Sequence, residues 1–416
     1  MTPDVLVVGG GFAGFWAAVA ARRAGGAGTT VTLMSERPQL ELRPRLYQAR
    51  PEELAVDIRP MLASIGVDVV AATVTDVDPI RRAVQSSGGW TYYRRMVVAT
   101  GSAQRRPAVP GAEHAFSVDS QAEAIAFDGR LRRLARRAES FSVVVVGAGF
   151  TGLEVALELR SRVEGHSHGA GELLHVVLVD RSARAGESLG PGPRPVIEAA
   201  LHRGRVEVRP STTVTRVLDD QVVLADGSLV AADAVVFTVG MAASPFAHRV
   251  PGEHDHLGRI LVDEHLRAFA DEAIFVAGDA AAARDRHGHV VLQSCQHALQ
   301  LGRYAGENAA RSLSGASLLP YAQPPYVTCL DLGDSGAVYT TGWERTVQAT
   351  GRRAKSIKHT INTEVIHPPV HAPPEELLAL SVPRVLREGT TAGAVPGTGE
   401  GERYFRTRRR CDVRAR

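Results

Sequence analysis

The sequence predicts an α/β protein in which two units of parallel sheet are joined to a smaller α+β region. A valine-rich run, a G-x-G-x-x-G loop and a helix-forming stretch occur in this order twice, at 5–18 and at 143–156. Strands buried on both faces are continuous apolar runs, and the glycines permit a tight turn from such a strand into a helix. The 416 residues suffice for two or three domains, each with its own core.

The composition is that of an ordinary α/β protein. A hydrophobic content of 44% and a net charge of +3 give no indication of a nucleic-acid partner. Lys355 and Lys358 are the only lysines, and we attribute the arginine bias to coding composition. No apolar run reaches the roughly 18 residues that span a bilayer. Because no basic-then-apolar leader is present, we expect a cytoplasmic protein, with peripheral contact to a membrane left open.

The cysteines and histidines do not form a metal or disulfide motif. Cys295, Cys329 and Cys411 are far apart and make no C-x-x-C, which excludes a redox disulfide of neighbouring cysteines and a zinc ribbon. For Cys295, a small buried side chain is favoured over a reactive thiol. His166 and His168 have no further ligands at metal spacing, so we expect a solvated loop there and no metal.

The first glycine loop has the residues that a dinucleotide phosphate requires. Gly9 permits the tight turn, Gly11 lets phosphate oxygens approach the backbone, and Gly14 brings the helix close to the strand. Phe12 and Ala13 complete the loop, and the helix N-terminus faces the pyrophosphate. The sequence therefore predicts a dinucleotide site at this turn.

A carboxylate follows the loop at the distance expected for ribose binding. A helix from about 14 to 24 leads to a second strand at 30–34, after which come Glu36 and Arg37. Glu36 follows Gly14 by 22 residues, which is close to the spacing of a carboxylate that accepts ribose hydroxyls. We expect Glu36 and Arg37 to belong to the first dinucleotide site.

The other strands of the first unit are predicted from short apolar runs. Strands are expected at 67–70 and 83–85, the second followed by a Ser-Ser-Gly-Gly turn. A further strand at 92–100 is buried. It ends in Ala99, Thr100 and Gly101.

The second unit repeats the glycine device. Its first helix carries five arginines that we interpret as a solvated face: Arg130, Arg132, Arg133, Arg136 and Arg137. Gly147, Gly149 and Gly152 then take the three glycine positions, and Thr151 lies among them. Two loops with flanking strands and helices make turns of purely structural origin a poor explanation.

A second carboxylate follows the second loop. An insertion at 164–169 accounts for the longer distance to Asp180, which ends the next strand. Short alternating strands with a hairpin turn at Asp226-Gly227 follow, and the last strand of the unit ends at Gly240. Asp180 and Gly240 are thus candidates for the second dinucleotide site.

The chain then returns to the first unit. A strand from 273 ends in Gly278 and Asp279, and a helix is expected at 296–313. The predicted division is listed in chain order: first unit 1–110, inserted second unit 111–245, remainder of the first unit 246–325, α+β region 326–385 and disordered tail 386–416.

The order of these motifs resembles the flavoproteins with two dinucleotide-binding domains, the glutathione-reductase-like class. The loops at 9–14 and 147–152, the Ala99–Gly101 element and Gly278-Asp279 carry the resemblance, which covers roughly residues 4 to 312. It implies two Rossmann-like domains, one for FAD and one for NAD(P), the second inserted in the first. It also implies that Asp279 hydrogen-bonds the ribityl chain of FAD.

A finer resemblance is to the type II NADH dehydrogenases. Their second loop continues T-G-x-E, as 151–154 does, and P-x-L-Y-Q at 44–48 is similar to the segment that approaches their flavin. The residues L-D-L-G and G-A-V within 330–338 resemble the start of their third domain. Arg45 departs from the apolar residue that this family tends to have.

The segment C-Q-H-A-L-Q-L-G at 295–302 resembles this family's helix start A-Q-x-A-x-Q-Q-G. The resemblance implies that Gln296 and Gln300 line the flavin–quinone region and that Ala298 belongs to the cofactor site. The helix N-terminus would favour an anionic reduced flavin. Leu301 replaces one of the paired glutamines, which puts the quinone role in question, and Gln296 has the alternative of a plain polar helix residue.

Two acidic residues of the second unit have alternative interpretations. The resemblance implies that Glu154 points at the contact of nicotinamide and flavin; otherwise it is a first-turn residue stabilised by the helix dipole. Asp180 favours NADH because a carboxylate repels a 2′-phosphate. Arg181 and Arg184 nearby could reverse that preference, so NADPH stays open.

The sequence thus predicts an FAD-dependent oxidoreductase that takes a hydride from NADH and passes electrons to a quinone or another small acceptor. The protein's share is positioning and flavin electronics. A soluble tailoring enzyme or electron-carrier reductase is an alternative, because the tail is polar and rich in arginine. A redox sensor that binds FAD and NAD(H) but turns over slowly is another. A homodimer is left open.

Overall fold

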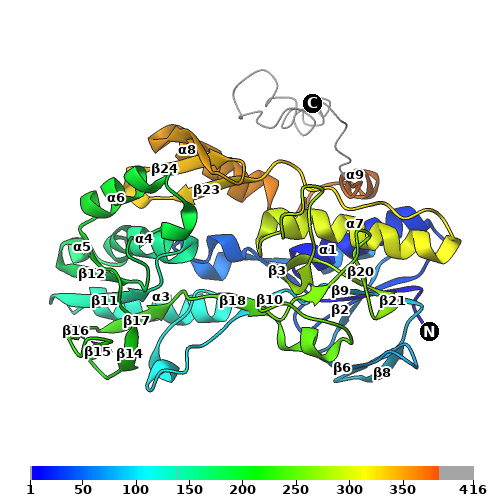
Figure 1. The fold of residues 1–416 in the computed structure, drawn as a ribbon, viewed down its shortest axis with the longest axis horizontal. Helices are drawn as coiled ribbons and strands as arrows, with labels where there is room; N and C mark the ends of the chain where they lie inside the picture. Colours follow the sequence, from blue (N-terminus) through cyan, green and yellow to red (C-terminus); the bar gives the residue numbers. More distant parts are fainter. Residues whose placement is uncertain (1, 138, 384–416) are drawn as a thin grey trace.

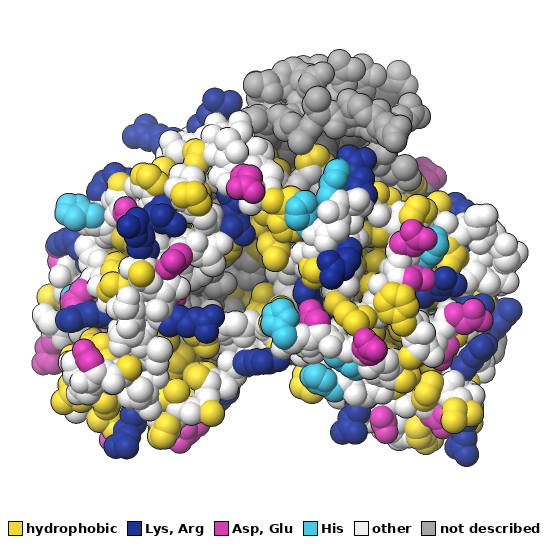
Figure 2. All heavy atoms as spheres, viewed as in Figure 1, with side chains coloured by type: hydrophobic (Ala, Val, Ile, Leu, Met, Phe, Trp, Pro, Cys, Tyr) yellow, Lys and Arg dark blue, Asp and Glu magenta, His cyan; other side chains and the backbone are white. Residues whose placement is uncertain are grey.

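The computed structural model describes residues 2–137 and 139–383, which form two lobes side by side with a third region lying across them (Figure 1). The surface is hollowed between the two lobes on the face that Figure 2 shows. The first lobe is built on a sheet in the order β20-β21-β9-β1-β2-β5. Its strands are β1 (Val5–Val8), β2 (Val31–Ser35), β5 (Asp68–Ala71), β9 (Arg95–Val98), β20 (Arg267–Ala268) and β21 (Asp271–Val276). β21 pairs parallel with β9, so the chain returns to the first lobe after building the second.

Two helices pack closely on this sheet. α1 (Phe12–Gly25) lies against α7 (Cys295–Ser314), as Figure 1 shows. A Cβ at Gly302 would lie 2.2 Å from the Ala13 carbonyl oxygen, and one at Gly306 would lie 2.0 Å from that of Ala17. Glycine is therefore required at both positions for the two helices to approach.

The second lobe contains a parallel sheet in the order β13-β12-β11-β17. Its strands are β11 (Phe141–Val146), β12 (Leu174–Val179), β13 (Val206–Arg209) and β17 (Ala234–Phe237), with helices α3 (Gln121–Ala135), α4 (Phe150–His166), α5 (Ala170–Leu173) and α6 (Arg194–Arg203). A small antiparallel sheet adds β14 (Val214–Val217), β15 (Gln221–Leu224) and β16 (Leu229–Ala231). The β15–β16 turn contains Asp226-Gly227, as predicted.

Two short strands connect the lobes. β10 (Ser102–Gln104) and β18 (Met241–Ala243) pair antiparallel between them (Figure 1). Three further sheets lie outside the main ones: β3 (Gln39–Glu41) with β4 (Ala55–Asp57), β6 (Val74–Asp78) with β7 (Ala83–Ser86) and β8 (Gly89–Tyr92), and β19 (Ile260–Leu261) with β22 (Ala281–Ala282). The short helix α2 (Arg59–Ser64) precedes β5.

The C-terminal region lies over both lobes (Figure 1). Its antiparallel sheet comprises β23 (Val327–Asp331), β24 (Ala337–Thr341) and β25 (Thr346–Thr350), followed by α8 (Gly351–Thr360), a π-helical turn (Ile361–Val365) and α9 (Pro374–Leu380). The α/β class with two parallel-sheet units and an α+β region is thus confirmed. The tail predicted at 386–416 lies outside the described residues. Within the described part of the chain, no helix is long and apolar enough to cross a membrane.

Two local predictions were wrong. The strand predicted at 92–100 is divided between β8 and β9, because the amide of Tyr93 bonds Arg82 outside the main sheet. The insertion at 164–169 is partly helical, since α4 continues to His166. The His166 side chain is 14% exposed and contacts the Asp128 carboxylate at 3.1 Å, so it is not solvated, whereas His168 is fully exposed as predicted.

Candidate active site

The first glycine loop leaves room for a phosphate at one place and none at two others. Gly9 has φ 111°, and a Cβ there would lie 2.3 Å from the Ala99 carbonyl oxygen. A Cβ on Gly14 would lie 1.8 Å from the Gly9 carbonyl oxygen. At Gly11 a Cβ would meet no atom within 4 Å. The loop is thus closed toward the protein and open at its middle glycine, which fits the pyrophosphate of FAD.

The predicted residues around this loop lie at the carboxyl edge of the first sheet. Phe12 and Ala13 are buried in the first turn of α1. Glu36 and Arg37 follow β2 directly and are exposed. The Gly9 amide donates to the carbonyl of Met34 at 2.8 Å, which holds the loop beside the end of β2.

The end of β9 and the Gly278-Asp279 turn complete this edge. The Thr100 hydroxyl accepts a hydrogen bond from Ser244 at 2.7 Å, and Gly101 has φ 68°. Gly278 has φ 67°, and a Cβ there would lie 2.7 Å from that of Ala13. The Asp279 carboxylate accepts a hydrogen bond from the Ser102 hydroxyl at 2.7 Å.

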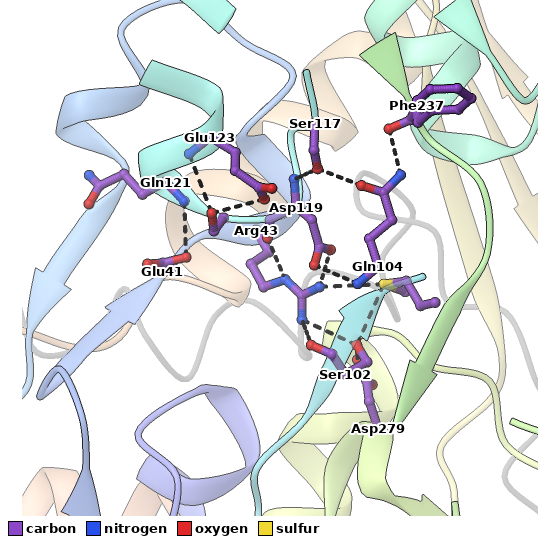
Figure 3. A network of polar contacts seen from close by, with 12 residues as sticks. Glu41, Arg43, Ser102, Gln104, Ser117, Asp119, Gln121, Glu123, Phe237 and Asp279 are labelled. Atoms are coloured by element: carbon purple, nitrogen blue, oxygen red, sulfur yellow. Dashed lines mark hydrogen bonds and ion pairs between the residues drawn. The ribbon is translucent and has the colours of Figure 1, made fainter. Parts of the chain in front are cut away.

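Asp279 belongs to a polar network that sequence reasoning missed (Figure 3). Burial raises the pKa of the Asp279 carboxyl above its usual range, against the opposing effects of Ser102 and the Arg43 guanidinium. Arg43 also forms an ion pair with Asp119 on the segment that enters the second lobe. Neither residue belongs to a glycine motif, so no sequence pattern pointed to them.

The start of α7 packs next to the same turn. Ala298 is buried, and the Gly278 Cβ position lies 3.6 Å from the Ala298 Cβ. The Gln296 side-chain amide exchanges hydrogen bonds of 3.2 and 3.3 Å with the backbone of Val327. Gln300 is buried and accepts a bond from Arg303 at 3.4 Å. Gln296 therefore ties α7 to β23 rather than standing as a plain surface residue.

Two residues that depart from the family pattern have clear positions. Leu301 is 1% exposed and packs in the core, so its side chain is not available to an acceptor. Burial raises the pKa of the Cys295 thiol to about 11. The thiol is therefore protonated at neutral pH, which favours a packing role for this partly buried side chain over a reactive nucleophile.

The second glycine loop repeats the geometry of the first. Gly147 has φ 105°, and a Cβ on Gly152 would lie 1.7 Å from the Gly147 carbonyl oxygen. At Gly149 and Gly240 a Cβ would meet nothing within 4 Å, and Thr151 is exposed beside the opening. The residues present therefore fit a second dinucleotide.

Asp180 is turned toward this loop. Its carboxylate accepts hydrogen bonds from the amides of Ala148 at 2.6 Å and Ser182 at 2.7 Å. Arg181 and Arg184 are exposed. The carboxylate thus stands at the loop, held there by two backbone amides.

Glu154 points away from solvent, toward the C-terminal region. It is 7% exposed, and its carboxylate accepts bonds from the Lys358 ammonium at 2.7 Å and the Asp331 amide at 3.0 Å. Because it is the fifth residue of α4, the alternative of a first-turn residue stabilised by the helix dipole was wrong. Burial lowers the pKa of Lys358, but the adjacent Glu154 carboxylate raises it above the usual value.

Strand β23 connects three helices at alternate residues. Val327 bonds Gln296 of α7, the Cys329 carbonyl accepts from Lys358 of α8 at 2.9 Å, and the Asp331 amide donates to Glu154 of α4. The buried Glu154–Lys358 ion pair is therefore held in register with the start of α7. The only two lysines of the chain lie on α8. Their isolated occurrence was the one sequence feature that could have pointed to a specific role for Lys358.

A cavity of about 240 Å³ lies next to this ion pair. Residues of all three regions line it, among them Arg45, Gln48, Glu158, Asp331, Lys355 and Asn362. Burial raises the pKa of Glu158 to about 7. Lys355 bonds Asp331 at 2.5 Å, and the Tyr47 hydroxyl donates to the same carboxylate at 2.9 Å. Polar side chains thus extend from the ion pair toward solvent.

Comparison with known proteins agrees with this arrangement. Residues 3–302 match the family model described as pyridine nucleotide-disulphide oxidoreductase. An NADH dehydrogenase-like protein of Mycobacterium tuberculosis is 42% identical over 393 residues, 92% of this chain and 98% of that protein. The demethylphylloquinone reductase NdbB of Synechocystis is 28% identical over 357 residues, 81% of this chain and 86% of that protein.

Solved structures with the same fold include NDH2 from Plasmodium falciparum in complex with NADH. It has a TM-score of 0.74 at 11% identity and covers 92% of this chain and 97% of its own. A sulfide:quinone oxidoreductase from Aquifex aeolicus has a TM-score of 0.72 at 16% identity, covering 86% and 89%. Two dinucleotide loops, the family match over most of the chain and the NADH dehydrogenase-like relative agree: the chain belongs to the pyridine nucleotide-disulphide oxidoreductase family and is an FAD-dependent oxidoreductase that uses NAD(P)H.

Proposed function

We propose that this protein oxidises NADH and reduces a quinone-type acceptor. The observation that carries the proposal is the buried Glu154–Lys358 ion pair, which β23 holds in register with the start of α7. Reduction of a quinone to a quinol consumes two electrons and two protons, whereas NADH supplies a hydride. One proton must therefore come from solvent, and a buried carboxylate beside an ammonium can hold and release it.

The cofactor and the chain have separate tasks. FAD, when bound between Gly11 and Asp279, supplies the two-electron relay from nicotinamide to acceptor. The two glycine loops hold the two pyrophosphates, and the carboxylates Glu36 and Asp180 stand where they would accept ribose hydroxyls. Glu154 and Lys358 keep a proton next to the acceptor side, and the adjacent polar cavity leads to solvent.

NADH, rather than NADPH, is the donor in this proposal, because Asp180 repels a 2′-phosphate. Gln296 supports the acceptor side by holding the start of α7 against β23. Gln300 accepts a hydrogen bond from Arg303 on the same helix, and its place at the flavin–quinone region stays a prediction. The relative NdbB carries the name of a quinone reductase, which supports an acceptor of this class. Cytoplasmic location, peripheral membrane contact and a homodimer stay predictions.

The test is a two-step experiment under anaerobic conditions. The flavin is first reduced with NADH or with NADPH, and the reduced protein is then mixed with quinones, a ferredoxin-like carrier or oxygen. We expect fast bleaching with NADH and rapid reoxidation by quinones. A long-lived complex of reduced flavin and NAD would instead support a redox sensor, and reoxidation by the carrier protein alone would support an electron-carrier reductase.

A further inference from the structure

Arg43 is the centre of a set of contacts that joins several separate segments (Figure 3). It lies in a 3₁₀ turn, Arg43–Arg45, of the first lobe. Its guanidinium donates to the Asp119 backbone carbonyl at 2.9 Å and to the Asp119 carboxylate. It also donates to the Ser102 carbonyl at 3.1 Å and the Ser102 hydroxyl at 3.2 Å. One side chain thus contacts β10 and the segment that enters the second lobe.

The contacts continue in two directions from Arg43. Toward the cofactor site, Ser102 donates its hydroxyl to Asp279 at 2.7 Å. Toward the second lobe, Asp119 accepts the Gln104 amide at 2.9 Å, and the Gln104 side chain donates to the carbonyl of Phe237 at the end of β17 at 2.5 Å. Figure 3 shows both branches meeting at the guanidinium.

We propose that Arg43 is a positioning residue that couples FAD binding to the orientation of the two lobes. Through Ser102 it holds the Asp279 carboxyl in place to accept a ribityl hydroxyl, and its positive charge opposes the rise of the Asp279 pKa. Through Asp119 it fixes the paired strands β10 and β18 that connect the lobes. The position of these strands determines where the second glycine loop lies relative to the first. This proposal depends on the FAD site and not on the identity of the acceptor.

The charged groups around Asp279 predict how FAD binding should respond to the loss of Arg43. Burial and the Asp119 carboxylate raise the pKa of Asp279, whereas the Ser102 hydrogen bond, Arg43 and Arg259 lower it. Removing the charge of Arg43 takes away one of the groups that oppose burial and the Asp119 carboxylate, and leaves the Ser102 hydrogen bond and Arg259. The Asp279 pKa then rises further, so that FAD affinity should fall more steeply than in the wild type as the pH is lowered.

The test compares three variants with the wild type: Arg43→Met, Arg43→Lys and Asp119→Asn. FAD is titrated into each apoprotein at pH 6, 7 and 8 and followed by quenching of flavin fluorescence. The rate of flavin reduction by NADH is then measured by anaerobic stopped flow at saturating FAD. Arg59→Met is the matched control, because Arg59 forms an exposed ion pair with Asp57 in the same lobe.

Each variant has its own expected result. For Arg43→Met we expect FAD affinity to fall about tenfold at pH 8 and further at pH 6, with slower reduction by NADH. Arg43→Lys keeps the charge but not the fork that holds two partners. Its FAD affinity should therefore depend on pH as in the wild type, and its flavin should be reduced by NADH more slowly. Asp119→Asn should bind FAD with wild-type affinity. Its flavin should be reduced by NADH more slowly, because only the connection through β10 and β18 is loosened.

Two results would overturn the proposal. A wild-type pH profile of FAD binding in Arg43→Met would show that Arg43 does not hold the charge of Asp279. Wild-type reduction rates in both Arg43→Lys and Asp119→Asn would show that the lobes are oriented without it. If Arg43→Met does not fold, these two conservative variants still decide the coupling. Binding is measured without an acceptor, so a failed quinone assay leaves the outcome unaffected.

Discussion

The two glycine loops have nearly the same backbone, yet the helices that follow them differ. Gly11 and Gly149 have φ values of −75° and −77° with the same ψ of −167°, and each third glycine lies against the carbonyl of its first. The helix α1 carries no acidic residue and packs on α7. The helix α4 carries Glu154 and Glu158 toward the C-terminal region. The spacing of the glycines determines the backbone of the phosphate-binding loop. The residues in the next two turns of the helix determine which part of the protein packs behind that loop.

A second difference concerns the two ribose carboxylates. Asp180 accepts hydrogen bonds from two backbone amides, one of them in its own glycine loop. Glu36 is exposed, and its neighbour Arg37 pairs with Glu41 at 3.3 Å. An identical motif thus has a carboxylate held in place in one copy and exposed in the other. We expect the second loop to be the more preorganised of the two.

The largest expected effect comes from the third glycine of each loop. Gly14→Ala and Gly152→Ala place a Cβ within 2 Å of a carbonyl oxygen that cannot move without opening the turn. We expect each to cost more than about 3 kcal/mol of stability. Gly14→Ala should lose bound FAD, whereas Gly152→Ala should keep the flavin absorbance and lose its reduction by NADH.

The matched controls are Gly11→Ala and Gly149→Ala, whose added Cβ atoms meet no protein atom. Their free energies of unfolding should lie within about 1 kcal/mol of that of the wild type. Each variant should weaken only the binding of the dinucleotide at its own loop. Equal loss of stability in the controls would mean that the loops are not closed by the third glycine.

The next effect tests the connection that α4 makes and α1 lacks. Lys358→Met leaves the Glu154 carboxylate buried without its partner, which should lower the free energy of unfolding by about 3–5 kcal/mol. The double variant Glu154→Gln with Lys358→Met removes both charges and should recover much of that loss. Denaturant titrations of the wild type, both single variants and the double variant measure the coupling. Additive losses would contradict a direct ion pair.

A smaller effect is expected from Glu158, one turn further along α4. Its pKa is raised to about 7, so the folded protein holds a proton that the unfolded chain releases at a lower pH. The resulting stabilisation is complete below pH 4.5 and is lost as the pH rises through 7. Glu158→Gln should therefore be more stable than the wild type by about 2 kcal/mol at pH 8 and equal to it near pH 4. Thermal melting is measured for both proteins from pH 4 to pH 8. A stability difference that does not change with pH would contradict a raised pKa of Glu158.

The smallest effect sharpens the comparison of the two ribose carboxylates. Asp180→Ala removes the acceptor of the Ala148 amide and should cost about 1 kcal/mol. It should also raise the ratio of NADPH to NADH activity about tenfold, since the repelling charge is gone. The ratio of kcat/KM for the two donors is the measurement. Glu36→Ala, as the control, should leave this ratio unchanged.

Much of the fold was predictable because its signals are local. A valine run followed by G-x-G-x-x-G determines a buried strand and a turn whatever the rest of the chain does. The return of the chain from 273 onward followed from one more strand that ends in Gly278-Asp279. The strand at 92–100 was misjudged because its apolar run does not reveal that Tyr93 bonds the neighbouring hairpin.

The sequence by itself determined the two dinucleotide loops, since the clash of a Cβ with a carbonyl depends only on residues five apart. Only the tertiary structure decided what these loops are connected to. Glu154 and Lys358 are 204 residues apart, and Arg43 and Asp119 are 76 apart. An ion pair has no spacing rule along the chain, because it forms wherever folding buries two opposite charges together. The loops could therefore be found by pattern, and their partners only by the fold.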